Sequence, residues 1–220
     1  MSTHHIRFHY FPVRARGEHL RYILHQSGRP FEEEVMNPQT WPEFKPKTPF
    51  GALPMVTVDG KTQISQSLVV GQFLAAELGL AGRNHLEASR VFMLAHGVSD
   101  CHEAMISKQL NQLLVPFFNK MDWNAATELW QKDLKPNTWA PFCERYTKFL
   151  QENGGTWLVG DRVSWADLFL AELGDRIMKV VDPNCLDPYP LLKEHCKRVH
   201  ELPNIKKYVS QRKPFFDKDW

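Results

Sequence analysis

The stretch PFGALPMVTVDGKTQISQS, residues 49–67, decides how this chain folds. At its centre, Asp59-Gly60 is among the strongest short signals for a β-hairpin, because both residues tolerate the positive φ that a tight turn requires. The residues on either side of the pair predict two strands, over 55–58 and 61–65. The stretch is therefore expected to contribute two antiparallel strands to a sheet.

A helix is predicted to begin where the second of these strands ends. Residues 67–78 are almost all apolar, so we expect this helix to be buried between layers. The first turn of a helix carries N–H groups without intrahelical partners and a partial positive charge, so it can hold a carboxylate or a phosphate. The hairpin thus leads directly to a possible anion site at Gln66-Ser67.

The composition is that of an ordinary globular protein. The chain has 220 residues, of which 43% are apolar and 24% charged, with a formal net charge of +2. This balance, without a run of Lys and Arg, does not indicate nucleic-acid binding, and no apolar run is long enough to span a membrane. The four cysteines show no CxxC spacing, so we expect reduced thiols in a cytoplasmic protein.

The first part of the chain alternates between strand and helix patterns. Strands are predicted over residues 4–10 and 31–35, with a helix over 17–27 between them and a proline-rich loop over 36–50 after them. Ile6, Phe8 and Tyr10 share one face of the first strand, and Gly28 ends the helix. The order β-α-β-loop-β-β-α predicts a mixed four-stranded sheet with helices packed on it.

The remainder of the chain is predicted to be all-helical. Residues 79–82 (GLAG) form a linker, which divides the chain into domains over 1–82 and 83–220. Helices are predicted over residues 86–118, 124–132, 139–151, 164–180, 189–201 and 203–212. Ser164 and Asp167 have the spacing of a capping box, which is a structural role.

These motifs, in this order, resemble the cytosolic glutathione transferases, especially the sigma class seen in nematodes and related to the haematopoietic prostaglandin D synthases. The resemblance covers essentially the whole chain. It is carried by Tyr10-Phe11, residues 14–18 (RARGE) with Arg21, Trp41-Pro42 with Lys45, residues 49–54 (PFGALP), residues 58–61 (VDGK), Gln66-Ser67, residues 79–82, and residues 157–161 (WLVGD). It implies a thioredoxin-like α/β domain over 1–82 and an all-α domain over 83–220, which contributes the second-substrate pocket and the dimer contacts.

The resemblance implies a homodimeric enzyme that conjugates reduced glutathione, its co-substrate, to hydrophobic electrophiles. Tyr10 is the expected catalytic residue. A free thiol with a pKa of about 8.5 is only a few per cent thiolate at neutral pH, and a hydrogen bond from the phenol to the sulfur favours the anion. Arg16 would reinforce this field, and Phe11 would begin the wall of the second-substrate pocket.

The resemblance also assigns residues to the two ends of glutathione. Gln66-Ser67 would hold the γ-glutamyl carboxylate at the helix start, and Trp41 and Lys45 would hold the glycyl end. Asp100 would reach the γ-glutamyl amine from the partner subunit.

The extended segment before the hairpin supplies the middle of the expected glutathione site. Leu53 would pair with the cysteinyl backbone through its main chain, and Pro54 is cis in the family. Ala52 stands where many sigma enzymes have Gln or Lys. His96 and Ser99 replace two acids that hold a divalent ion in prostaglandin D synthases, so we expect no metal. The complete predicted set is Tyr10, Phe11, Arg16, Trp41, Lys45, Gly51, Ala52, Leu53, Pro54, Gln66, Ser67 and Asp100.

Each of these residues also has a structural alternative. Tyr10 could be only a core aromatic of its strand, and Ser67 could be a plain helix N-cap. His195-Cys196 with His200 could suggest a metal site, but the spacing fits no zinc pattern.

Alternatives are also open at the level of function. The same thiolate could serve as a prostaglandin-endoperoxide isomerase or a glutathione peroxidase, and the fold could instead serve a non-catalytic carrier of hydrophobic ligands or a structural protein. A thiol-exchange protein is disfavoured because no cysteine lies near the turn after Tyr10. The second substrate is not identified, since its pocket would draw on the helix around His102 and Met105 and on the tail at Phe215-Phe216.

Overall fold

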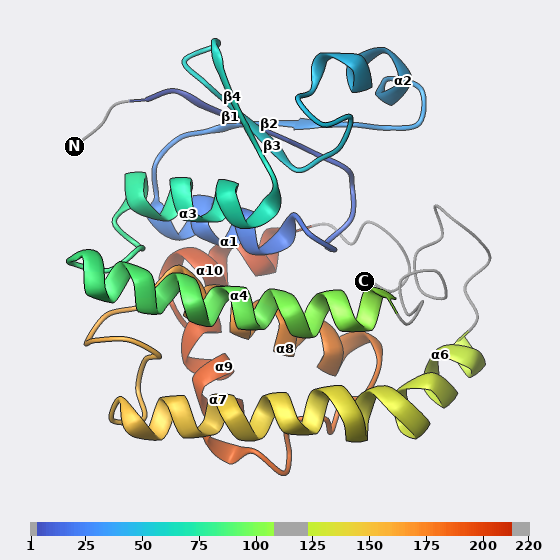
Figure 1. Cartoon of the computed structure of the whole chain (residues 1–220), viewed down its shortest axis with the longest axis vertical. Coiled ribbons are helices and arrows are strands. Elements are labelled where there is room, and N and C mark those ends of the chain that lie inside the picture. Colours follow the sequence, from blue (N-terminus) through green and yellow to red (C-terminus); the bar gives the residue numbers. More distant parts are fainter. Residues whose placement is uncertain (1–3, 108–122, 213–220) are drawn as a thin grey trace.

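The computed structural model describes residues 4–107 and 123–212. A sheet domain lies above a group of helices (Figure 1). The elements are β1 (Ile6–Tyr10), α1 (Glu18–Ser27), β2 (Glu32–Val35), α2 (Trp41–Phe44), η1 (Lys45–Lys47), β3 (Met55–Val58), β4 (Thr62–Ser65), α3 (Ser67–Leu78), α4 (His85–Ser107), α6 (Trp123–Leu129), η2 (Trp130–Trp139), α7 (Ala140–Glu152), α8 (Trp165–Val180), α9 (Pro190–His200) and α10 (Pro203–Gln211). The predicted fold class, a mixed-sheet α/β domain followed by an all-α domain, is confirmed.

The sheet has four strands in the order β2-β1-β3-β4. β1 runs parallel to β2, with Tyr10 opposite Val35, and antiparallel to β3, with Phe8 opposite Val56. The Arg21 guanidinium of α1 lies over the rings of Phe8 and Tyr10, so this face of β1 is turned toward α1. The mixed topology follows from the helical crossover between β1 and β2 and the hairpin between β3 and β4.

The hairpin forms where the sequence predicts it. Asp59 and Gly60 both have positive φ, 51° and 68°. The Asp59 carboxylate also accepts a hydrogen bond from the His5 N–H at 2.9 Å, which ties the turn to the start of β1. Just before β3, the Leu53-Pro54 peptide bond is cis, as the resemblance implies.

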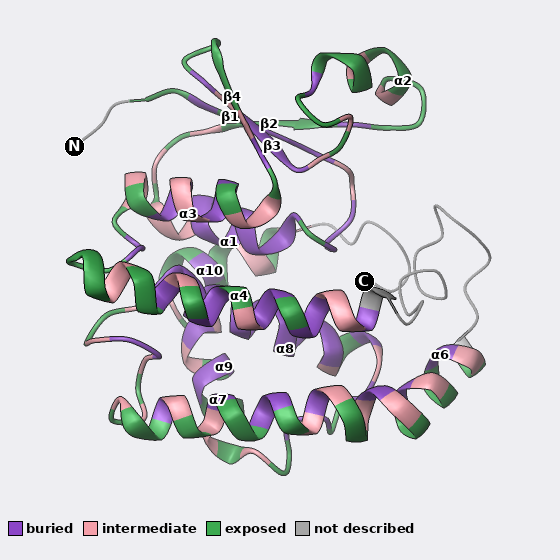
Figure 2. Cartoon of the chain, viewed as in Figure 1, coloured by how far each residue is buried: buried purple, intermediate pink, exposed green. Residues whose placement is uncertain are grey.

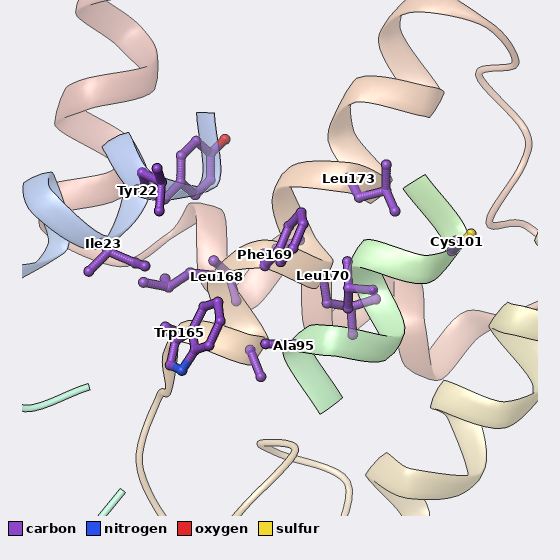
Figure 3. Packing of buried hydrophobic residues seen from close by; sticks show 14 of the residues in the cluster. Tyr22, Ile23, Ala95, Cys101, Trp165, Leu168, Phe169, Leu170 and Leu173 are labelled. Carbon is purple, nitrogen blue, oxygen red and sulfur yellow. The ribbon is translucent and has the colours of Figure 1, made fainter. Parts of the chain in front are cut away.

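Helix α8 forms the centre of the molecule. It packs on α4 within the helical domain and on α1 of the sheet domain, and Figure 2 shows buried residues gathered where these helices meet. In the close view of Figure 3, Trp165 of α8 lies between Ile23 of α1 and Ala95 of α4, and Phe169 follows one turn later on α8. A single hydrophobic core therefore continues from one domain into the other.

The predicted helix break between residues 132 and 139 is wrong. Helices α6, η2 and α7 follow one another without interruption, and η2 is a π-helix that contains Pro136. Trp130, Leu134 and Trp139 are all buried in η2. The wider π turn keeps these three side chains on the core side, and their burial outweighs the propensity that disfavours an internal proline.

Two further expectations need correction. Helix α3 is not buried all round, because Val69 is 52% exposed while Val70 and Leu74 are fully buried. The proline-rich loop contains the short helices α2 and η1, and Phe44 of α2 stacks on His9 on the outer face of β1. The predicted extension of α4 to residue 118, like the tail after residue 212, lies outside the described residues.

Candidate active site

A cleft of about 600 Å³ opens between the sheet domain and α4. Its wall on the sheet side includes the predicted site residues Arg16, Ala52, Leu53, Pro54, Gln66 and Ser67. The opposite wall comes from α4, through Phe92, His96, Ser99 and Glu103. The fold thus brings three predicted parts of the site together: Arg16, residues 52–54 and residues 66–67. It adds a wall from α4 that the sequence interpretation assigned incompletely.

The start of α3 is open toward this cleft. Gln66, with a φ of 76°, occupies the N-cap position, and its own side chain makes no capping hydrogen bond. The alternative that Ser67 is a plain N-cap is therefore wrong, because Ser67 is the first helical residue. Ser65, Gln66, Ser67 and Leu68 all line the cleft. The N–H groups of this first turn are available to an anion in the cleft.

Tyr10 lies behind the cleft, at the end of β1. The residue is 4% exposed, and its hydroxyl oxygen accepts a hydrogen bond from the Arg16 N–H at 3.0 Å. Burial raises the pKa of Tyr10, against the opposing effects of this N–H and of nearby Arg21. The phenol is therefore protonated at neutral pH and can donate a hydrogen bond.

The Arg16 side chain is engaged with a residue that the sequence interpretation missed. Its guanidinium forms a bidentate ion pair with Glu103 of α4, with Nε donating at 2.7 Å. Both side chains are almost half exposed, 44% and 42%. The Arg16 charge is thus partly neutralised by Glu103, and the pair bridges the two walls of the cleft.

A second group of predicted residues lies outside the lining of this cleft: Phe11, Trp41, Lys45 and Gly51. The Phe11 ring lies 5.8 Å from the Tyr10 ring and 5.1 Å from the Trp41 ring, between centroids. The exposed Lys45 side chain passes Gly51, where an added Cβ would lie 3.4 Å from the Lys45 Cε. The loop that carries Trp41 and Lys45 is therefore joined to the end of β1 through aromatic contacts.

Asp100 is solvent-exposed on α4. Its side chain is 71% exposed, and its carboxylate lies 3.4 Å from the His96 Nδ1 one helical turn earlier. Two other α4 residues differ from the expectation. His102 and Met105 are buried, 1% and 0% exposed, so they do not line the cleft. Ser99 and Glu103 face the cleft instead of His102 and Met105.

A buried cluster of charges behind the cleft was also missed. Four charged residues are 0% exposed: Arg14 after β1, Glu18 at the start of α1, and Glu172 and Arg176 of α8. The Glu172 carboxylate lies 3.1 Å from the Arg14 guanidinium and 2.9 Å from that of Arg176. Glu172 and Arg176 are four residues apart in α8, the spacing of an intrahelical ion pair, and that spacing was the available signal.

The described residues contain no group of three or more His, Cys, Asp and Glu side chains that could hold a metal ion. His195 instead lies 2.9 Å from the Asp167 carboxylate, and the His200 Nδ1 lies 2.7 Å from the Cys196 carbonyl oxygen. Cys196 and the other three cysteines are buried and unpaired by disulfides. Within the same residues, no helix is long and apolar enough to cross a membrane.

Comparison with known proteins decides the family. The family described as "Glutathione S-transferase, C-terminal domain" matches residues 109–212. The chain is 34% identical to probable glutathione S-transferase gst-36 of Caenorhabditis elegans, over 95% of this chain and 97% of the relative. The chain belongs to the glutathione S-transferase family. It is also 31% identical to glutathione S-transferase 1 of Ascaris suum, over 92% of this chain and 94% of that relative.

Solved structures agree with this family. The crystal structure of the glutathione S-transferase from Ascaris lumbricoides has a TM-score of 0.81 and 30% identity, over 96% of this chain and 100% of that one. The protein is therefore a glutathione S-transferase with glutathione as its co-substrate, and its fold is the glutathione-transferase fold.

The structural relatives differ in class and assembly. One from Haemonchus contortus is described as Nu-class, with 30% identity and a TM-score of 0.78 over 96% of this chain and 98% of that one. One from Onchocerca volvulus is described as Pi-class, with 28% identity and a TM-score of 0.78 over 94% and 93%. Na-GST-3 of Necator americanus, with 29% identity and a TM-score of 0.82 over 95% and 98%, is described as monomeric. These likenesses establish the family without assigning a class.

Proposed function

We propose that this glutathione S-transferase conjugates reduced glutathione to hydrophobic electrophiles through a thiolate that Tyr10 stabilises. The supporting observation is the state of the Tyr10 hydroxyl group. Its oxygen accepts the Arg16 N–H, burial keeps it protonated by raising its pKa, and its O–H proton has no acceptor within residues 4–107 and 123–212. A sulfur beside this hydroxyl would receive the hydrogen bond, which favours the thiolate over the thiol.

The proposed orientation of glutathione follows the cleft. The γ-glutamyl carboxylate would bind the open start of α3 at Gln66-Ser67, which the absence of a capping hydrogen bond from the Gln66 side chain supports. The main chain of Leu53, on the cleft wall, would pair with the cysteinyl backbone. Trp41 and Lys45 would hold the glycyl end, on the side of the site where Lys45 passes Gly51.

The experiment that tests this function is Tyr10→Phe. Loss of the phenol proton should return the bound thiol to a pKa near 8.5, and turnover at neutral pH should fall by roughly 20-fold if Tyr10 lowers that pKa by about two units. Glutathione affinity, measured by calorimetry, should stay similar because no carboxylate contact is lost. Unchanged turnover with a chlorinated dinitrobenzene would remove Tyr10 from the mechanism.

The second substrate is proposed to be an apolar electrophile. Phe50, Leu68, Val69 and Phe92 contribute apolar surface to the cleft beside the polar residues of α4. Isomerisation of a prostaglandin endoperoxide and reduction of lipid hydroperoxides would use the same thiolate, and product analysis with each substrate separates these activities from conjugation. A non-catalytic carrier would bind such ligands but show no conjugation of the dinitrobenzene.

We also propose a homodimer in which Asp100 reaches the γ-glutamyl amine bound to the partner subunit. Asp100 is exposed, and so are three large apolar residues: one in the loop before β3, one on α3 and one on α4. Their exposure supports this arrangement. Phe50 is 67% exposed, Val69 52% and Met93 55%. Sedimentation should give twice the 25.6 kDa mass of the chain, and Asp100→Asn should weaken glutathione binding without changing that mass.

Three further assignments remain proposals. The domain boundary is placed after residue 82, with the helical domain providing the second-substrate pocket and the dimer contacts. The sigma class is supported by the sequence motifs around Tyr10, Lys45 and Gln66-Ser67. A cytoplasmic location is supported by the four cysteines, which are not paired in disulfides.

A further inference from the structure

The peptide group between Ala15 and Arg16 is held at both of its polar atoms. Its N–H, that of Arg16, donates to the Tyr10 hydroxyl oxygen at 3.0 Å. Its carbonyl, that of Ala15, accepts a hydrogen bond from the Arg176 guanidinium at 3.2 Å. The N–H and C=O of one peptide are coupled by resonance. A single peptide therefore connects a charged side chain of α8 to the hydroxyl group of Tyr10.

We propose that Arg176 is a positioning residue of the transferase, which acts on Tyr10 through the Ala15-Arg16 peptide. A guanidinium at the carbonyl oxygen polarises the peptide and makes its N–H a stronger donor. A stronger hydrogen bond to the phenol oxygen then makes the phenol O–H a stronger donor in turn. The sulfur of glutathione is the acceptor that gains, so this inference rests on the proposed role of Tyr10.

The conformation of Ala15 depends on these contacts. Its φ is 29°, in the region that L-residues other than Gly, Asn and Asp rarely adopt. Such a conformation persists only where the surrounding structure holds it. Here Arg176 and Tyr10 hold the carbonyl and the N–H of the one peptide that follows the Ala15 Cα. Ala15 itself is 8% exposed. The turn thus directs the N–H at the phenol.

The Arg176 guanidinium is itself fixed in place. Its Nη2 donates to the Glu172 carboxylate at 2.9 Å, and its Nη1 lies 3.2 Å from the His102 Nε2. Burial lowers the pKa of His102, so its ring is neutral and this nitrogen can accept. All three side chains are at most 1% exposed. Away from water, the field of the guanidinium on the peptide is weakly screened.

Other charged groups surround both ends of this connection. Arg16, Arg21 and Arg176 are the cations that act on Tyr10. The groups that act on Arg176 itself are Glu172, Arg14, Glu18 and Tyr10, with His102 in contact and His19 nearby. The Arg16 guanidinium is 44% exposed and paired with Glu103, so solvent and Glu103 weaken its effect. Arg176 is the cation of the three that is hydrogen-bonded to the peptide next to the phenol.

The test is Arg176→Lys, because an ammonium group cannot reproduce the planar fork that contacts both Glu172 and the Ala15 carbonyl. We expect the pKa of bound glutathione, titrated by the ultraviolet absorbance of its thiolate, to rise by roughly half a unit to one unit. Turnover below that pKa should fall about 3-fold to 10-fold, and the two enzymes should converge at alkaline pH. Glutathione affinity should change little.

The matched control is Arg14→Lys. Arg14 is equally buried and lies 3.1 Å from the same Glu172, so its replacement disturbs the same charge cluster. Its side chain donates to Glu172 and Asp175 of α8, whereas the Ala15 carbonyl accepts its hydrogen bond from Arg176. We expect Arg14→Lys to lower stability while leaving the thiol pKa where it is. An equal shift in both variants would overturn the proposal.

Two further variants separate the possible failures. In a Tyr10→Phe background, Arg176→Lys should add no further shift, and an undiminished shift would refute the route through the phenol. If Tyr10→Phe alone leaves the thiol pKa unchanged, the proposed function fails instead. If Arg176→Lys does not fold, Glu172→Gln decides, since removing the negative partner of Arg176 should lower the thiol pKa, and a rise would overturn the proposal.

Discussion

Gly17 is the residue that allows the Tyr10 ring to lie where it does. A Cβ at position 17 would lie 2.1 Å from the Tyr10 Cδ1, far inside van der Waals contact. The φ of Gly17 is −104°, which any residue adopts, so space and not conformation requires glycine here. The helix start and the Tyr10 ring are therefore packed with no room for a methyl group.

Replacing this glycine should damage catalysis more than stability. Gly17→Ala must displace the Tyr10 ring from the Arg16 N–H, so we expect turnover to fall at least ~10-fold and the free energy of unfolding to fall by about 1–3 kcal/mol. Steady-state kinetics and urea denaturation measure the two effects. Gly79→Ala is the control, because Gly79 has a φ of 78° and no atom within 4 Å of an added Cβ. It should cost stability alone, and an equal loss of turnover there would contradict this account.

His19 makes stability depend on pH. Its ring is 1% exposed and stacks on Phe169 at 3.9 Å between centroids. Burial, with a contribution from Arg176, lowers the pKa of His19 to about 3. The folded ring stays neutral down to that pH, whereas the unfolded chain takes up a proton near pH 6.5. The free energy of unfolding is therefore expected to fall as the pH drops from about 6.5 toward 3.

Removing the titrating ring should flatten this dependence. His19→Phe keeps the stacking partner of Phe169, so the acid-induced loss of stability should become smaller by up to about 1.4 kcal/mol per pH unit below pH 6.5. Urea midpoints at pH 7 and pH 5.5 measure the slope, and the exposed His85→Phe is the control. Equal slopes for wild type and His19→Phe would show that His19 does not titrate on unfolding.

At the scale of elements, the start of α8 depends on one carboxylate. Asp167 accepts hydrogen bonds from the N–H groups of Leu158 and Ser164, each at 2.8 Å, and from the Ser164 hydroxyl at 2.6 Å. The capping box predicted from the sequence is present, and the bonds to Leu158 and to His195 extend it to two other segments. This side chain joins the entry loop, α8 and α9.

Asp167→Ala should therefore cost more than the loss of a helix cap. Ser164→Ala removes a hydroxyl and is expected to lower the free energy of unfolding by about 1 kcal/mol. Asp167→Ala leaves buried N–H groups of Leu158 and Ser164 without acceptors, so we expect a loss of about 3–5 kcal/mol. Denaturant titration of both variants gives the comparison. Similar losses for the two would mean that only the cap matters.

The helical run α6–η2–α7 is continuous where the local sequence predicts a break. Pro136 and the polar residues around it favour a break, yet the backbone continues as a π-helix. The Trp130 Nε1 donates to Asp182 at 3.0 Å and the Trp139 Nε1 to the Cys185 carbonyl at 3.1 Å. These partners lie on the segment after α8, so no local signal could reveal them.

At the scale of the whole molecule, Glu18 ties the C-terminal helix to the sheet domain. Its buried carboxylate accepts from the Tyr208 hydroxyl at 2.9 Å and from Arg21 at 3.1 Å, and it pairs with Arg212. Burial alone would raise the pKa of Glu18, but the surrounding arginines lower it to about 2. A charge this buried is stable only because α1 and α10 supply its partners together.

Glu18→Gln should loosen α10 from the rest of the fold. Loss of the buried negative charge that Arg21 and Arg212 share is expected to lower the free energy of unfolding by about 3–5 kcal/mol. Amide hydrogen exchange in α10 should speed up more than exchange in α8. The control is Glu201→Gln, which removes an exposed pair with Lys206 and should cost far less stability. Equal costs would show that burial does not decide the strength of these pairs.

The sequence by itself determined the features that depend on near neighbours. The turn at Asp59-Gly60, the end of α1 at Gly28 and the capping box at Ser164 all formed where expected. Each rests on the φ preference of one residue or on a hydrogen bond within a few positions, so residue type is enough to reveal it. The apolar face of β1 was equally visible, because alternation alone defines it.

Only the tertiary structure decided which charges are buried and what they face. Arg16 meets Glu103 across 87 positions, and Arg176 meets the Ala15 carbonyl across 161. A lone arginine in a sequence is more often a solvated surface charge, and its burial becomes favourable only when the fold delivers a partner. The local signals predicted the open start of α3 at the hairpin's end, whereas the α4 wall opposite it and the support behind Tyr10 arose only from packing.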